Sequence, residues 1–307
     1  MKILITPKIN PDLDGLACAY AYSKLLNVVD QDNEYVAGIF GQPHIEARFL
    51  LGKLGIKDTL HFNPETNFAK FIIVDASDLK GMPKIIRPED VIEVVDHRIV
   101  HQAGKIFINA QINIELLGAA ATLIFEKYQT QKIDFDYSSA LLLYGAIFSN
   151  TLNFQVDIAG FRDREAVRAL SEKFNMPVDI INEMFQYKTD YSEDNLVESI
   201  RDDSKTFNLK TGQKISIAQI EGFDLENIFR LKEKEIGSAL RELKAAAELD
   251  IIFLNLVDIK NGFNIIVTID DESRLLLSDK LGLKFIGNIS RTDQLWLRKQ
   301  IMPILMN

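Results

Sequence analysis

The feature that most constrains the fold is a short apolar run, followed by an acidic loop and then a small, apolar helix candidate. Residues 3–6 are expected to form a buried strand, and asparagine, proline and glycine mark the loop after it. Asp12 and Asp14 lie in this loop, and Asp14 is the expected N-cap of a helix over 16–26. In an open parallel sheet, ligand crevices form at such turns, and paired carboxylates there suit a hard divalent cation.

A buried strand followed by an acidic residue occurs twice more. Residues 71–74 lead into Asp75, and residues 91–95 lead into Asp96 and His97. Between and after these strands the sequence predicts a strand over 34–40 and helices over 45–54, 116–128, 137–148 and 163–174. Alternating strands and helices predict a parallel, doubly wound α/β sheet whose strand ends open at one edge. We therefore expect the acidic residues to converge.

A lone aspartate after a strand more often caps a loop than binds a metal ion. Several carboxylates brought together would repel and raise one another's pKa unless cations lie between them. Convergence therefore predicts either a metal ion or basic counter-charges. By contrast, the amphipathic helix over 163–174 is rich in arginine and glutamate, and we expect a solvated face there.

The length of the chain, 307 residues with 47% hydrophobic residues, is enough for two domains. The polar stretch 187–195 is the predicted linker, which gives domains over 1–190 and 196–307. In the second half the sequence predicts hairpin strands over 205–207 and 214–220, a helix over 225–249, and strands over 251–257 and 263–269. This pattern indicates a smaller, mixed-sheet α+β domain.

Charge and hydropathy exclude some classes of function. A net charge of −9 argues against nucleic acid as the main partner, but a few converging cations would still bind a small phosphorylated substrate. No run approaches the roughly 20 apolar residues that cross a bilayer, and no signal peptide is recognisable, so we expect a cytoplasmic protein. The single Cys18 is expected to be a small packed hydrophobe.

Two sets of motifs resemble a known family. Asn-Pro-Asp-Leu-Asp at 10–14, the strand end at Asp75 and Val-Asp-His at 95–97 resemble the successive motifs of the DHH phosphoesterase superfamily. The segments 204–207, 217–219 and 297–303 resemble the accessory (DHHA2) domain of manganese-dependent, family II inorganic pyrophosphatases. The glycine- and histidine-rich signature of the nuclease branch is missing from the sequence, which favours the pyrophosphatase branch.

The resemblance implies hydrolysis of inorganic pyrophosphate to two phosphates by a metal-activated hydroxide, in an active cleft between the domains. It implies one or two Mn²⁺ ions, or Mg²⁺ or Co²⁺, since two cations about 3.5–4 Å apart can activate water and steady the leaving oxygen. The implied metal ligands are Asp12, Asp14, Asp75 and His97, with Asp75 bridging. The implied phosphate-binding residues are Lys205, Arg298 and Lys299. By analogy, a homodimer through an edge strand is also expected.

Three positions depart from the family pattern, and all lie at the site. Lys8 replaces the first histidine ligand, and its ammonium would repel a metal ion. Asn150 replaces an aspartate, although its carbonyl oxygen can still ligate Mg²⁺ or Mn²⁺. Arg98 replaces the second histidine of the triplet, which contacts substrate in the family. Together these changes make the pocket more positive by roughly two to three charges.

The departures leave several interpretations open. One is a single metal ion near Asp14, Asp75 and His97, with Lys8 occupying or screening the second position and Asp96 as a further counter-charge. Another is a metal-free, non-catalytic cleft that binds a phosphorylated ligand, in which the side chains of Lys8 and Arg98 balance the carboxylates. A third is a shifted loop that lets another histidine ligate; the candidates are His44, His61 and His101. An exopolyphosphatase or a nucleotide phosphoesterase is the alternative activity, because the bidentate guanidinium of Arg98 reaches farther than imidazole.

Overall fold

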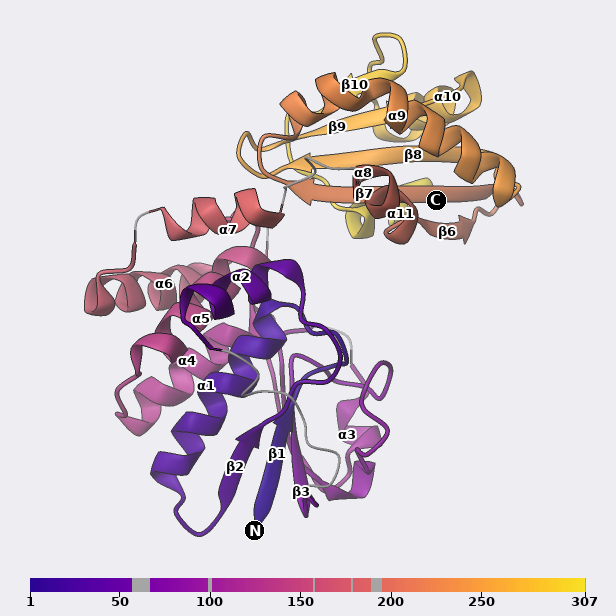
Figure 1. The fold of residues 1–307 in the computed structure, drawn as a ribbon. Coiled ribbons are helices and arrows are strands. Elements are labelled where there is room, and N and C mark those ends of the chain that lie inside the picture. The colour runs from indigo at the N-terminus through magenta and orange to yellow at the C-terminus, as the bar shows by residue number, and fades with distance from the viewer. Residues whose placement is uncertain (57–66, 99–100, 157, 178, 189–194, 307) are drawn as a thin grey trace. The chain divides into compact units, whose positions relative to one another are not determined.

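The computed structural model describes residues 1–56, 67–98, 101–156, 158–177, 179–188 and 195–306. The chain divides into two compact units, 1–187 and 188–307 (Figure 1). We call these the N-terminal unit and the C-terminal unit, and each is described by itself. The predicted linker lies largely outside the described residues.

The N-terminal unit is built on a parallel five-stranded sheet in the order β2-β1-β3-β4-β5. The strands are β1 (Lys2–Thr6), β2 (Glu34–Ala37), β3 (Lys70–Val74), β4 (Val91–Asp96) and β5 (Gln111–Ile114). The central strands β1, β3 and β4 are almost wholly buried, as expected of apolar strands covered on both faces. The predicted doubly wound α/β class is confirmed.

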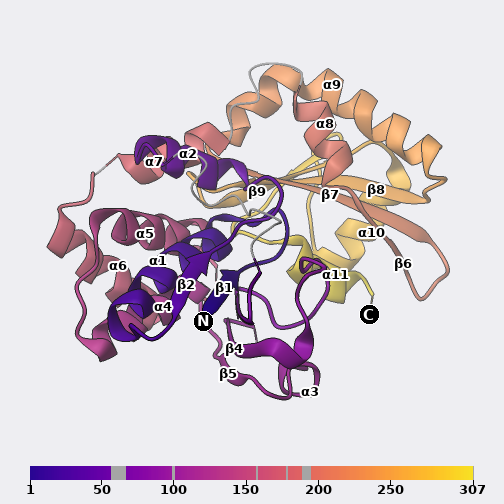
Figure 2. The ribbon, with the colours of Figure 1, turned by 60° about the horizontal axis from the view of Figure 1, so that its bottom comes forward.

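Helices cover both faces of this sheet. The helices of this unit are α1 (Leu13–Val29), α2 (Ile45–Lys53), α3 (Ala103–Ile106), α4 (Ala120–Gln131), α5 (Tyr137–Asn150), α6 (Phe161–Phe174) and α7 (Ile180–Lys188). Figures 1 and 2 show α1, α4 and α5 on one face and α3 on the other. Leu4, Phe71 and Ile73 pack into the cluster around Phe107 just after α3, and the alternate residues of these strands point to the opposite face.

Two predicted boundaries in this unit differ from the structure. The helix predicted over 116–128 begins only at Ala120, because residues 117–119 form a loop that contacts the site described below. The strand predicted over 34–40 ends at Ala37, since the chain turns away before a bend at Gly41, where φ is +74°. The edge strand β5 and the short helix α3 were not predicted; both are only four residues long and carry little periodicity.

The C-terminal unit contains a mixed five-stranded sheet in the order β10-β9-β8-β7-β6. The strands are β6 (Lys205–Asn208), β7 (Lys214–Gly222), β8 (Ile251–Asp258), β9 (Phe263–Thr268) and β10 (Ile289–Arg291). Only β7 and β8 pair in parallel. The helices are α8 (Asn195–Asp202), α9 (Leu225–Ala246), α10 (Asp271–Leu281) and α11 (Arg298–Leu305). The mixed α+β architecture confirms the prediction, although α8, α10, β10 and α11 were not foreseen.

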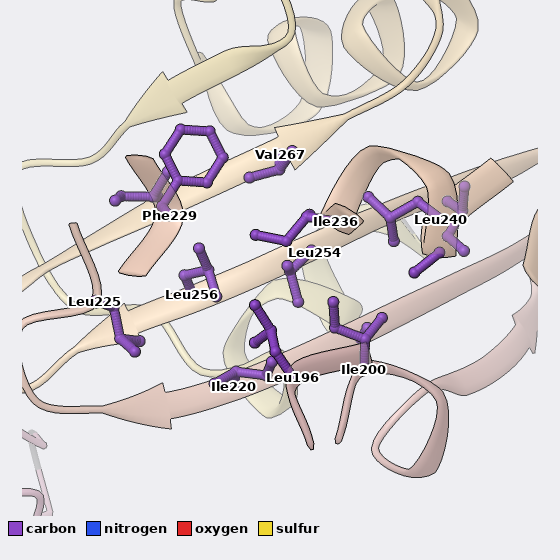
Figure 3. Packing of buried hydrophobic residues seen from close by; sticks show 14 of the residues in the cluster. Leu196, Ile200, Ile220, Leu225, Phe229, Ile236, Leu240, Leu254, Leu256 and Val267 are labelled. Atoms are coloured by element: carbon purple, nitrogen blue, oxygen red, sulfur yellow. The ribbon is translucent and has the colours of Figure 1, made fainter. Parts of the chain in front are cut away.

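The helix α9 covers one face of the mixed sheet. Its residues Leu225, Phe229 and Ile236 lie over Leu254 and Leu256 of β8 (Figure 3). Burying each of these side chains contributes roughly 1.5–3 kcal/mol to folding. The helix ends three residues earlier than predicted and is interrupted at Lys232, where φ is −121°. Among the helices of the described residues, none combines the length and apolar character needed to cross a membrane.

Candidate functional site

The two aspartates after β1 have different places: one caps α1 and the other lies inside it. Asp12 is the N-cap of α1, and its Oδ1 accepts a hydrogen bond from the Gly15 amide at 3.0 Å. The prediction that Asp14 is the N-cap was wrong, because the helix begins at Leu13 rather than after Gly15. Asp14 therefore lies in the first turn, where its side chain is buried.

The carboxylate of Asp14 is held at the N-terminus of α4. Its Oδ2 accepts hydrogen bonds from the Ala120 amide at 2.8 Å and from Asn150 Nδ2 at 2.9 Å, and its Oδ1 accepts from the Ala121 amide at 2.8 Å. A helix N-terminus favours negative charge. Burial and the nearby charge of Asp75 nonetheless raise the pKa of Asp14 well above its ordinary value. A bound cation would relieve this cost.

The imidazole of His97 is oriented by a backbone carbonyl. Its Nδ1 lies 2.9 Å from the carbonyl oxygen of Leu117, so an Nδ1–H donates there. Its Nε2 faces Asp75 Oδ1 at 3.5 Å and Asp14 Oδ2 at 3.9 Å. Burial disfavours the imidazolium, but the hydrogen bond with Asp75 and the charges of both carboxylates outweigh it and raise the pKa of His97 to about 9.

Asp75 follows β3 in a left-handed conformation, with φ of +52°. Such a conformation costs a non-glycine residue about 1–3 kcal/mol and is concentrated at functional sites. The Asp75 amide donates to the carbonyl of Val95 at 2.8 Å, which ties the ends of β3 and β4 together. Burial and the charge of Asp12 raise the pKa of Asp75 to about 6.

Asp14, Asp75 and His97 form the candidate metal site. One donor atom from each lies within 4.8 Å of the others. Two carboxylate oxygens and an imidazole nitrogen suit a first-row divalent cation such as Mn²⁺, and the Leu117 carbonyl supplies the usual outer hydrogen bond to a ligating histidine. These residues therefore fit a metal ion. Asp12 lies outside this group, but its charge contributes to the raised pKa of both carboxyl groups.

The side chain of Asn150 approaches the candidate metal site with its nitrogen. Nδ2 lies 2.9 Å from Asp14 Oδ2, 3.1 Å from the Gly118 carbonyl oxygen and 3.3 Å from His97 Nε2. In this orientation the amide donates to two oxygens, and it would have to make a half turn before its own carbonyl oxygen could ligate. Asn150 thus lies where a ligand is expected, but with its donor end inward.

Arg98 and Asp96 lie beside the candidate metal site as a charge pair. Asp96 is fully buried; its Oδ1 accepts from the His97 amide at 2.8 Å, and its Oδ2 has no hydrogen-bond partner among the described residues. Arg98 Nε lies 3.6 Å from that Oδ2, and Nη2 lies 3.4 Å from the Asp75 carbonyl oxygen. The guanidinium therefore compensates Asp96 while reaching the edge of the site.

Lys8 and the histidines other than His97 are not part of the candidate metal site. The stem of Lys8 runs along Gly81, with Cδ 3.8 Å from where a Cβ on that glycine would be. Within the part of the chain that the structure describes, no carboxylate lies within 4.0 Å of its amine. His44 and His101 are exposed and outside the metal-capable group, and His61 lies outside the described residues.

The three predicted phosphate-binding residues line one pocket of the C-terminal unit, which we call the cationic pocket. Its volume is about 420 Å³. The residues that line it are Lys205, Phe207, Gln219, Glu221, Leu297, Arg298, Lys299 and Met302. They come from β6, β7 and the start of α11, so segments far apart in the sequence form a single concave surface.

The cations of this pocket differ in how far they are already paired. Arg298 donates from Nη1 and Nη2 to Asp203 Oδ2 and Oδ1 at 3.0 and 3.1 Å, and from Nη1 to the Ile217 carbonyl at 3.0 Å. Its side chain is only 11% exposed. Lys205 and Lys299 are exposed, and among the described residues neither has an ion pair. The lysines therefore carry the pocket's uncompensated charge.

A buried amide network supports the loop that leads into α11. Asn264 Oδ1 accepts from the Trp296 amide at 2.8 Å, and the side-chain amides of Asn255 and Asn264 donate to the Trp296 carbonyl at 2.8 and 2.6 Å. Gln219 Oε1 accepts from the Arg298 amide at 2.5 Å. The network fixes the backbone next to Lys299, and sequence patterns did not reveal it because its members lie on separate strands.

Comparisons with known proteins agree with this architecture. Residues 182–307 match the model of the DHHA2 domain. The manganese-dependent inorganic pyrophosphatase of Bacillus subtilis is 26% identical over 99% of this chain and 97% of its own length, and that of Methanothrix thermoacetophila is 27% identical over the same shares.

Solved structures show the same fold. A putative family II inorganic pyrophosphatase from Methanococcus jannaschii covers 100% of this chain and 98% of its own, with a TM-score of 0.68 and 21% identity. An exopolyphosphatase-related protein from Bacteroides fragilis covers 99% and 90%, with a TM-score of 0.52 and 13% identity. These likenesses show that the chain has the fold of these structures. Along its full length the chain is similar to manganese-dependent inorganic pyrophosphatases, and its C-terminal part matches the DHHA2 domain.

One buried carboxylate next to the site escaped the sequence interpretation. The helix over 163–174 was expected to have a solvated face, yet Asp163 at its start is fully buried against the loop before α4. The spacing from Gly160 to Asp163 is that of a capping box, which signals a helix start but not the contact with a distant loop.

Proposed function

We propose that the chain is a metal-dependent phosphohydrolase that splits inorganic pyrophosphate into two phosphates. The observation that carries this proposal is the grouping of Asp14, Asp75 and His97 within 4.8 Å in a chain whose full-length relatives are named manganese-dependent inorganic pyrophosphatases. The domain over 1–190 provides the metal site and the domain over 196–307 provides the phosphate-binding surface.

The residues of the N-terminal unit hold and orient the cation. Asp14, Asp75 and His97 would hold it, and the Leu117 carbonyl orients the His97 ring so that Nε2 faces the two carboxylates. A cation held there would supply Lewis-acid activation of a phosphoryl group and of water. Arg98, which already reaches the edge of the site, donates to a phosphoryl oxygen of the substrate as negative charge develops there.

We propose one firmly held ion rather than two. Lys8 occupies the sequence position of a histidine ligand, and an ammonium has no lone pair to offer. Asp12 uses one carboxylate oxygen as a helix cap and lies outside the metal-capable group. The site thus keeps the ligands of one cation and has lost donors for a second.

The exposed lysines of the cationic pocket bind the phosphate groups. Lys205 and Lys299 face solvent and have no ion pair among the described residues, so a phosphate that binds them does not have to displace a paired carboxylate. Arg298, which is bound to Asp203 and Ile217, instead fixes the start of α11 beside Lys299. This assigns two different roles to adjacent residues.

Phosphate release from pyrophosphate, measured with and without Mn²⁺, tests the proposal. We expect turnover with Mn²⁺, loss of turnover in a chelator, and a loss of at least about a thousandfold in Asp75→Ala. Asp134→Asn, which changes a carboxylate that is 86% exposed, is the matched control and should behave as the wild type. A pure preparation that remains inert with Mn²⁺, Mg²⁺ and Co²⁺ while still binding pyrophosphate in chelator would make the chain a non-catalytic binder.

The lining of the cationic pocket favours a second candidate substrate. Phe207, Leu297 and Met302 form an apolar wall beside the lysines, which a bare pyrophosphate would leave uncovered. Pockets of 300–1,000 Å³ with apolar walls and a few polar groups are typical of organic ligands. The alternative substrate is therefore a nucleotide phosphoester or anhydride. A comparison of kcat/KM for pyrophosphate, tripolyphosphate and ADP decides between these substrates. Phe207→Ala should lower kcat/KM for ADP alone.

A further inference from the structure

Asp163 is a fully buried carboxylate that accepts three hydrogen bonds. Its Oδ2 accepts from the amides of Gly160 at 2.9 Å and Gly118 at 3.0 Å, and its Oδ1 accepts from the Thr122 hydroxyl at 2.6 Å. The bond from Gly160 caps α6, to which Asp163 belongs. The other two bonds cross to the segment around the start of α4. A residue that caps one helix therefore also holds the beginning of another.

The segment that Asp163 holds is the one that orients the candidate metal site. The Leu117 carbonyl lies 2.9 Å from His97 Nδ1 and the Gly118 carbonyl 3.1 Å from Asn150 Nδ2. Two residues further on, the first amides of α4 bind the carboxylate of Asp14 at 2.8 Å each. Backbone groups of this one short segment thus contact two of the three candidate ligands.

The backbone at Gly118 is packed closely against Asp163 and Thr151. A Cβ placed on Gly118 would lie 2.9 Å from Asp163 Oδ2 and 2.5 Å from Thr151 Cγ2, both closer than real contacts allow. The Thr151 hydroxyl in turn donates to the Ile147 carbonyl at 2.6 Å, so that side chain is fixed to α5. Close packing makes the position of the 117–119 backbone depend directly on Asp163.

We propose that Asp163 is a positioning residue for the metal site. It sets the 117–121 backbone, and through that backbone it orients the His97 ring and holds the Asp14 carboxylate. Asp163 itself contacts neither candidate ligand, so its effect on the site is indirect. The inference rests on the proposed function only for the presence of a bound cation, since the contacts that it describes exist in the protein alone.

The test is the affinity for Mn²⁺ of the full chain carrying Asp163→Asn, measured by calorimetry. The amide oxygen can still accept from Gly118 and Gly160, but the amide nitrogen then faces Thr122, whose hydroxyl must accept instead of donate, and the buried charge is lost, so we expect Mn²⁺ to bind at least roughly tenfold more weakly. The matched control is Asp136→Asn. Asp136 caps α5 through the Ser139 amide and hydroxyl at 3.1 and 2.7 Å, which makes it a comparable cap.

We expect both variants to lose thermal stability and only Asp163→Asn to lose Mn²⁺ affinity. Equal Mn²⁺ affinity in the two variants would overturn the inference. Should Asp163→Asn not fold, Thr122→Val removes the 2.6 Å hydrogen bond alone and leaves the Gly118 bond intact. A weakening of about threefold to tenfold is then expected, and unchanged affinity would overturn the inference.

A second readout separates this inference from the proposed function. In metal-free protein, the Nδ1–H proton of His97 should exchange slowly because it is bound to the Leu117 carbonyl. We expect Asp163→Asn to speed this exchange by at least about tenfold, with no change in Asp136→Asn. A wild type that binds Mn²⁺ without hydrolysing pyrophosphate contradicts only the proposed function. Unaltered exchange together with unaltered Mn²⁺ affinity contradicts only the role of Asp163.

Discussion

In the N-terminal unit the charged groups of the candidate metal site are buried and held by backbone atoms, whereas in the C-terminal unit the lysines of the cationic pocket are exposed. Asp14 lies under the first amides of α4, and its pKa is raised by burial. Lys205 and Lys299 have no comparable support. Buried charge without a partner is costly, while exposed charge is inexpensive to keep but interacts weakly. From this difference we infer that the first region is organised to hold a cation, whereas the second can bind more than one kind of anion.

The largest effect should follow from neutralising a buried ligand. Asp14→Asn removes a charge and places a donor among amides that already donate, so we expect Mn²⁺ affinity to fall by at least about a hundredfold. Calorimetry measures this, with the exposed Asp134→Asn as control. If Asp14→Asn binds Mn²⁺ as well as the control, the N-terminal site is not organised for a cation and the comparison fails.

The affinity for Mn²⁺ should rise with pH. The pKa of His97 is raised to about 9, so its proton stabilises the metal-free fold fully below pH 6.5, and this stabilisation is lost as the pH rises through 9. A cation must displace that proton, so its affinity should increase by up to about tenfold for each pH unit between 7 and 9. Calorimetry in two buffers of different ionisation enthalpy measures the proton release. A pH-independent affinity would mean that His97 does not ligate.

A smaller effect is expected in the C-terminal unit. Lys299→Ala should raise the KM for pyrophosphate by about tenfold and leave Mn²⁺ affinity unchanged, because it removes one exposed, charge-assisted contact. Lys280→Ala, an exposed lysine of α10 away from the pocket, is the control. Steady-state kinetics decide the matter. A fall in kcat with constant KM would instead place Lys299 in the chemical step.

The smallest effect tests the separate role of Arg298. Asp203→Asn weakens the ion pair, but the guanidinium keeps its bond to the Ile217 carbonyl, so the KM should change by less than about threefold. Steady-state kinetics at several salt concentrations provide the measurement. A change of tenfold or more would show that freeing Arg298 alters phosphate binding directly, and both regions would then use buried, prepaired charge.

The sequence predicted the fold class well because β1, β3 and β4 are continuous apolar runs with acidic residues after them. It also pointed to Asp14, Asp75 and His97, since parallel strands end at one edge. It missed the cap at Asp12 because both aspartates of the loop fit the N-cap preference. It could not predict Asp163 or the Leu117 carbonyl, because contacts between distant loops and backbone oxygens leave no periodic signal.

The most direct test of the central claim is the anomalous scattering of a crystal of the full chain grown with Mn²⁺. We predict one strong manganese peak bound by Asp14, Asp75 and His97. A site that stays empty at saturating Mn²⁺, or manganese bound only elsewhere in the chain, would contradict the account.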